Sequence, residues 1–91
     1  MREYDFNKFG VCINPECFTF KCDQGDFKVE TAFLNGFWYN GHSINLPTEG
    51  LGIPCSNSGT PFKSEQQATN DACTRIKKWL IRREKNEQAN P

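Results

Sequence analysis

The last third of the chain carries the pattern that most limits what it can fold into. Ser64 is typical of a helix N-cap, and Gln67 follows three residues later, where the two side chains can satisfy each other's free backbone donors. Beyond this start, apolar residues recur three and four positions apart: Ala68, Ala72, Cys73, Ile76, Trp79 and Leu80. The spacing predicts an amphipathic helix over 64–85 with one apolar face, and a frayed polar tail over 86–91.

The residues ahead of the helix alternate between apolar and polar side chains, as half-buried strands do. Alternating runs cover 17–22 and 27–34, and the next residues are Asn35-Gly36, a pair favoured in tight hairpins because both accept positive φ. A third strand is expected over 37–46. It contains a second Asn-Gly pair, which we interpret as a bulge at Gly41, while a hairpin at this second pair stays open as the alternative.

These segments predict an α+β fold. It consists of a three- to four-stranded antiparallel β-meander over 17–46, with one C-terminal amphipathic helix packed on one face. Residues 1–16 are expected to form an N-terminal arm or short strand, and the proline- and glycine-rich stretch 47–61 a loop. With 91 residues, the chain is long enough for one domain around one modest core.

A sheet that carries a helix on one face has a second face to cover. Aromatic residues occur on both parities of the third strand, so some aromatic surface is expected to remain, and such patches commonly mark an interface. One interpretation is that this surface docks a protein partner or a second copy, and the other is that the N-terminal arm folds over it. If the surface stays open, its contact residues for a protein, or for unpaired bases in a nucleic-acid binder, are Phe37, Trp38 and Tyr39.

Basic residues repeat on a different side of the predicted helix, again three and four apart: Arg75, Lys78, Arg82 and Lys85. Such a row can contact the phosphates of a nucleic acid. It can equally be a solvated face that suits the helix dipole. The formal net charge of the chain is +0, which does not favour a dedicated nucleic-acid binder. Nucleic-acid binding is therefore the alternative function.

Cysteine and histidine residues raise the question of a metal site. A zinc-stabilised domain would use four ligands, here Cys12, Cys17 and Cys22 with His42 or, as the alternative, Cys55. The chain lacks the Cys-x-x-Cys pair typical of structural zinc, and Cys17 and Cys22 on one strand would point to opposite faces. The cysteine count is odd and nothing indicates export, so we expect free thiols in a reducing cytoplasm, with no cofactor.

Catalytic and membrane functions have little support in the sequence. His42 is the only histidine, and nothing in the spacing brings it to Cys55, the one candidate nucleophile on the loop. No apolar run approaches the length of a membrane span, and the first residues do not open a signal peptide. We therefore expect a non-enzymatic protein of the cytoplasm that does not contact membranes.

The order strand, turn, strand, loop and then Phe-x-Ser-x-x-x-x-Ala opening a helix resembles small sheet-and-helix modules of bacterial plasmid and phage proteins. Phe62, Ser64 and Ala68, with Trp38 upstream, carry this resemblance over about half of the chain. It implies a bacterial accessory protein that binds DNA or another protein. The expected function is thus a small interaction module, in a process that the sequence does not name, that binds a protein or itself through an aromatic sheet face.

Overall fold

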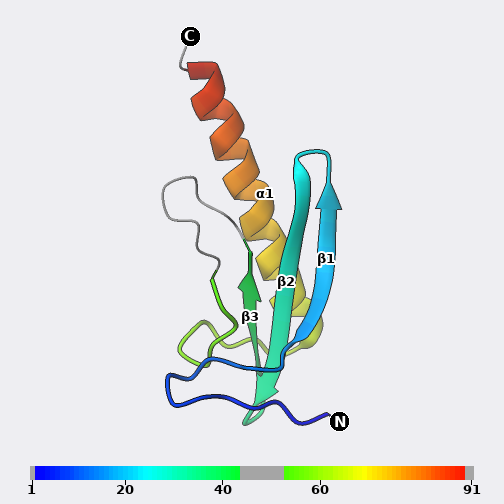
Figure 1. Ribbon diagram of the computed structural model, residues 1–91, viewed down its shortest axis with the longest axis vertical. Helices are drawn as coiled ribbons and strands as arrows, with labels where there is room; N and C mark the ends of the chain where they lie inside the picture. Colours follow the sequence, from blue (N-terminus) through cyan, green and yellow to red (C-terminus); the bar gives the residue numbers. More distant parts are fainter. Residues whose placement is uncertain (1, 44–52, 90–91) are drawn as a thin grey trace.

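The computed structural model describes residues 2–43 and 53–89. Three antiparallel strands form one sheet in the order β1-β2-β3, and the helix α1 lies across one of its faces (Figure 1). The elements are β1 (Glu16–Cys22), β2 (Gly25–Leu34), β3 (Phe37–His42) and α1 (Glu65–Ala89). This arrangement is the predicted α+β fold, with three strands in the sheet of the described residues.

The turn between β2 and β3 lies where the sequence predicts it. Asn35 and Gly36 both have positive φ, 50° and 90°, as a two-residue hairpin requires. The predicted bulge at Gly41 is wrong, because Glu30 and Gly41 are paired in an unbroken register. A side chain is excluded at Gly41 for another reason: a Cβ there would lie 2.3 Å from the backbone nitrogen of Cys55. The predicted strand residues 44–46 lie outside the described part of the chain.

The predicted N-cap at Ser64 is present, and only the hydrogen bond that returns from the Gln67 side chain differs from the prediction. The Ser64 hydroxyl accepts a hydrogen bond from the Gln67 N–H at 3.1 Å. The Gln67 side chain reaches back to the N–H of Lys63, also at 3.1 Å, rather than to that of Ser64. Helix α1 continues to Ala89, so residues 86–89, expected to fray, are helical.

The helix-side cluster is the larger of two hydrophobic clusters. It joins β2 to α1, and its buried members are Phe27, Val29, Ala72, Ile76 and Leu80. Val29 and Ile76 are fully buried, and the ring of Trp79 closes the edge of the cluster against Phe27 at 6.0 Å between centroids. The alternation of β2 and the three-and-four spacing of α1 place these residues opposite each other.

The arm-side cluster covers the other face of the sheet. Its buried members are Cys12, Ala32 and Cys55, and Tyr4, Phe6 and Tyr39 pack around them. Residues 53–62 bond to the outer edge of β3, since Ile53 pairs with His42 and Phe62 pairs with Trp38. The arm and this segment together therefore cover the face that a helix-and-sheet pattern alone leaves bare.

Candidate protein-binding groove

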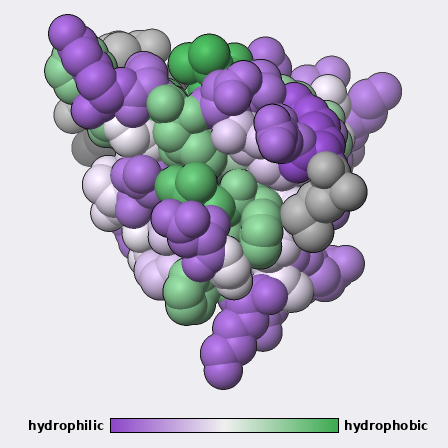
Figure 2. Space-filling view, turned by 90° about the horizontal axis from the view of Figure 1, so that it is seen from below, coloured by the Kyte–Doolittle hydropathy of each residue, from purple (hydrophilic) through white to green (hydrophobic). Residues whose placement is uncertain are grey.

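The aromatic residues of β3 do not form an open contact face. Trp38 lies between Tyr4 and Phe33, with ring centroids at 6.0 Å and 5.4 Å, and Tyr39 packs in the arm-side cluster. Only Phe37, beside the β2–β3 turn, is exposed. Figure 2, which looks at this end of the molecule, shows hydrophobic residues gathered in a band across it. Of the predicted contact residues Phe37, Trp38 and Tyr39, the structure thus leaves one accessible.

The four candidate zinc ligands are not brought together. Cys12 of the arm is buried in the arm-side cluster. Cys17 of β1 lies on the arm side of the sheet too, paired with Glu30, but is exposed. Cys22 and His42 belong to the helix side of the sheet, Cys22 beside the β1–β2 turn and His42 at the end of β3. Within residues 2–43 and 53–89, no group of three His, Cys, Asp or Glu residues is placed to hold a metal ion.

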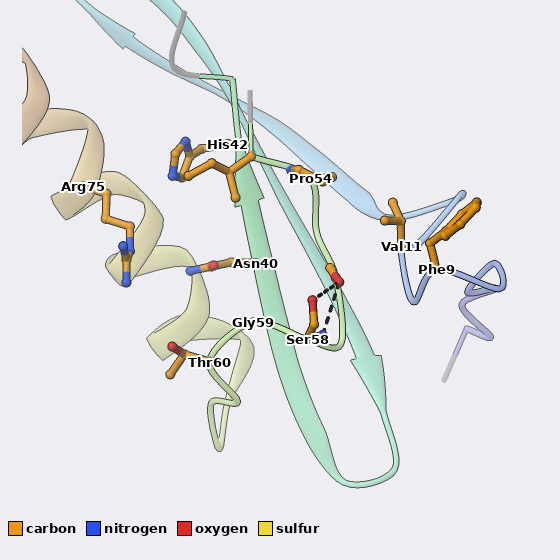
Figure 3. A pocket seen from close by; sticks show the side chains of 11 residues that line it. Phe9, Val11, Asn40, His42, Pro54, Ser58, Gly59, Thr60 and Arg75 are labelled. Atoms are coloured by element: carbon orange, nitrogen blue, oxygen red, sulfur yellow. Dashed lines mark hydrogen bonds between the residues drawn. The ribbon is translucent and has the colours of Figure 1, made fainter. Parts of the chain in front are cut away.

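A groove of about 440 Å³ lies between α1 and the N-terminal arm, along the outer edge of β3. Its floor is β3 together with the segment bonded to it, where Ile53 pairs with His42 and Ser56 pairs with Val11 of the arm. Figure 3 shows Arg75 of α1 with Asn40 and His42 of β3 on one side, and Phe9 and Val11 of the arm on the other.

Arg75, which lines the groove on its helix side, is held by Asp71 of the same helix. Its carboxylate accepts hydrogen bonds from Arg75 at 2.8 Å and from the Asn40 amide at 3.0 Å, and the same amide donates to the Ala68 carbonyl at 2.7 Å. Partial burial opposes ionisation of Asp71, but these hydrogen bonds outweigh it and lower the pKa of the carboxyl. Asp71 is therefore charged at neutral pH and holds Arg75 in place.

Three further predicted cations continue along the same stripe of α1. Lys78, Arg82 and Lys85 follow Arg75 at intervals of three and four residues, and all are exposed. None of these three forms an ion pair within the described residues. The predicted basic stripe is thus a row on one side of the helix, and Arg75, its first member, is neutralised by Asp71.

His42 is the buried polar group of the groove. Its side chain is 5% exposed, and its Nδ1 atom has no hydrogen-bond partner in the described structure. Burial lowers the pKa of His42, the charge of Arg75 lowers it further, and Asp71 opposes the change. The imidazole is therefore neutral at pH 7, and its Nδ1 atom is buried beneath the groove rather than exposed to it.

The opposite wall and the floor are apolar and open to solvent. Phe9 is 75% exposed and Ile53 is 56% exposed, and Pro54 lies beside them. Large apolar side chains that converge on one groove are a common feature of binding sites. The groove therefore combines an apolar surface with Arg75, the first member of the basic row that continues along the helix.

Sequence reasoning missed much of this site. Asn40 belongs to an Asn-Gly pair that reads as a turn, whereas the structure uses it to tie β3 to the helix. Phe9 and Ile53 lie on irregular segments of the structure, so a helix or strand period in the sequence does not show which way their side chains face. The Asp71–Arg75 pair does have a readable signal, since opposite charges four residues apart on a helix are neighbours.

Comparisons with protein-family models, with curated proteins and with solved structures found no match to this chain. In the part of the chain that the structure describes, no helix is both long enough and apolar enough to cross a membrane. The resemblance to plasmid and phage modules stays a prediction, and the function has to be argued from the groove itself.

Proposed function

We propose that the protein is a non-catalytic binding module that holds an acidic segment of another protein in the groove beside α1. The observation that carries this proposal is the pairing of two unlike walls. Arg75 lines one wall, and three exposed cations that form no ion pair among the described residues continue along α1 beyond it: Lys78, Arg82 and Lys85. Exposed Phe9 and Ile53 form the other wall. A peptide with carboxylates on one side and an aromatic or aliphatic anchor on the other matches both walls.

A protein partner fits this groove better than a nucleic acid does. The cations form a single row, the first of them is paired with Asp71, and the chain has a formal net charge of +0. Nucleic-acid affinity depends mainly on many phosphate contacts, which call for a broader basic surface.

We propose further that the protein is a bacterial accessory protein that works in the cytoplasm. The five cysteines are free thiols, which supports a reducing compartment. No catalytic step is proposed, since His42 is neutral and buried and Cys55 faces the arm-side cluster rather than the groove.

The binding test uses a fluorescent Glu–Tyr copolymer as the acidic, aromatic probe, with fluorescence anisotropy as the readout. Reversing two cations of the row, in a Lys78→Glu, Arg82→Glu double variant, should weaken binding by about tenfold, because attraction becomes repulsion. Lys77→Glu is the matched control. Lys77 lies on the other side of α1, over the ring of Phe20 at 5.8 Å, so this change should leave affinity within about twofold.

Two further probes decide between the walls and between the partner classes. Phe9→Ser should weaken binding of the Glu–Tyr copolymer and leave binding of plain polyglutamate unchanged. If a single-stranded oligonucleotide binds more tightly than the copolymer, and the double variant abolishes that binding, the nucleic-acid alternative replaces our proposal. If neither probe binds, the groove has no role in anion recognition and the proposal is wrong.

A further inference from the structure

We propose that the free edge of β1 pairs with the same edge of a second copy of this chain, so that two three-stranded sheets become one continuous sheet. This inference does not rest on the peptide groove, which lies at the opposite side of the molecule beside β3. It rests on the state of the two sheet edges, on the direction of the backbone groups along β1 and on the symmetry of the β1 sequence.

The two edges of the sheet differ in their hydrogen bonding. The outer edge of β3 is occupied: Trp38 exchanges both backbone hydrogen bonds with Phe62, and His42 exchanges both with Ile53, at 2.8 Å. The outer edge of β1 has no such partner among the described residues. β1 also lacks a proline or a bulge, and its charged residues, Glu16 and Lys21, lie toward its two ends, so its uncharged stretch 17–20 has none of the devices that normally protect an edge.

The register shows which backbone groups of β1 point outward. Cys22 and Gly25 close a two-residue hairpin, so they exchange both hydrogen bonds, and alternate residues back along β1 do the same with β2. The residues between them direct their N–H and C=O groups to the free edge: Cys17, Thr19 and Lys21. These groups form a ready template for another antiparallel strand.

Two copies that meet at this edge must be related by a two-fold axis perpendicular to the sheet. Directly paired residues then lie on the same side of the sheet. The register that overlaps the whole of β1 places Thr19 against Thr19 of the second copy and Cys17 against Lys21 of the second copy, both with outward-pointing groups. Phe18 then lies beside Phe20 of the second copy, an aromatic cross-strand pair of a kind that stabilises sheets.

The position of the helix leaves room for this pairing. α1 packs over β2 and β3, so the helix side of β1 is only partly covered and Phe18 is 41% exposed there. In the paired sheet both helices lie on the same side, with the Phe18–Phe20 pairs of the two copies in the strip between them. The exposed aromatic residue of β1 thus gains a partner on the same side.

The first test measures molar mass by light scattering during gel filtration, from micromolar to millimolar concentration. The unaltered protein should form dimers. Thr19→Pro removes a donor that points only to the free edge and leaves the β1–β2 ladder intact, so it should give a folded monomer. Thr19→Val keeps the donor and should remain dimeric. A protein that is monomeric throughout this range would overturn the proposal.

The second test reads the register directly and does not depend on the folding of the proline variant. Glu16 pairs with Cys22 of the second copy in this register, at a position without hydrogen bonds between the two residues, so Glu16→Cys should form a reducible covalent dimer on mild oxidation. Lys28→Cys, on the central strand, should not, and neither should the unaltered protein. A dimer that persists in Thr19→Pro and gives no Glu16→Cys cross-link uses another surface, which also overturns the proposal.

Discussion

The two faces of the sheet are buried by different kinds of structure. On the helix side, β2 and α1 meet through large aliphatic and aromatic residues with strict spacing, centred on Val29 and Ile76. On the arm side, small residues and cysteines are covered by two irregular segments, and Cys12 and Cys55 are the buried contacts. One face is closed by a regular element and the other by chain that is held at isolated backbone bridges.

The difference teaches that burial does not require periodicity. The arm and the 53–62 segment show no regular apolar period, yet their backbones are hydrogen-bonded to each other, as between Asn57 and Gly10, and the segment is also bonded to β3. Close approach of backbones, as at Gly41, adds to the packing of Tyr4 and Phe6 on small buried residues. Substitutions should therefore act through lost packing on the helix side and through steric overlap on the arm side.

The largest effect is expected on the helix side. Ile76→Ala removes a fully buried side chain at the centre of the helix-side cluster and should lower the free energy of unfolding by about 4 kcal/mol. Ile81→Ala is the matched control on the same helix, because Ile81 is 52% exposed. Urea denaturation measures both. Similar losses for the two variants would contradict the assignment of the packed face.

A comparable test on the arm side uses glycine. Gly41→Ala places a Cβ against backbone atoms of Ile53 and Cys55 that cannot rotate away, and we expect a loss of about 3 kcal/mol. Gly59→Ala is the control, since its Cβ would meet only the Ser56 carbonyl oxygen at 3.4 Å. If Gly41→Ala denatures at the same urea concentration as the unaltered protein, the 53–55 segment does not lie against β3 as described.

The start of the helix should respond more weakly. Ser64→Ala removes the acceptor of the Gln67 N–H and should cost about 1 kcal/mol in urea denaturation. Thr74→Ala, at an exposed position inside the same helix, should cost nothing or stabilise slightly, since alanine is the better helix former. A larger loss for Thr74→Ala than for Ser64→Ala would show that the cap is not formed.

The last prediction concerns pH and compares a buried thiol with an exposed thiol, both on the arm side. Burial raises the pKa of Cys55 from 9.0 to about 12, so the folded protein keeps this proton while the unfolded chain loses it above pH 9. The free energy of unfolding should therefore fall between pH 9.0 and about 12. Cys55→Ala should reduce that slope, whereas Cys17→Ala, at an exposed thiol, should not. Equal slopes in both variants would place Cys55 in solvent.

Prediction from sequence succeeded where a signal is local. The N-cap at Ser64 and the turn at Asn35-Gly36 depend only on neighbouring residues, and both are present. It failed at Gly41 because a glycine that permits positive φ and a glycine that permits close approach of another strand read the same in a sequence. The groove was out of reach for a similar reason, since Phe9, Ile53 and Arg75 come from three segments far apart in the chain.

The sequence by itself determined the secondary structure of the sheet and the helix, and which side of each is apolar. Apolar residues repeat every two positions in a strand and every three to four in a helix, so the sequence of each element shows which of its sides is buried. Only the tertiary structure decided that the arm and the 53–62 segment cover the second face and leave the β1 edge free. That outcome depends on backbone hydrogen bonds between distant segments, which any residue except proline can form and which therefore leave little trace in the sequence.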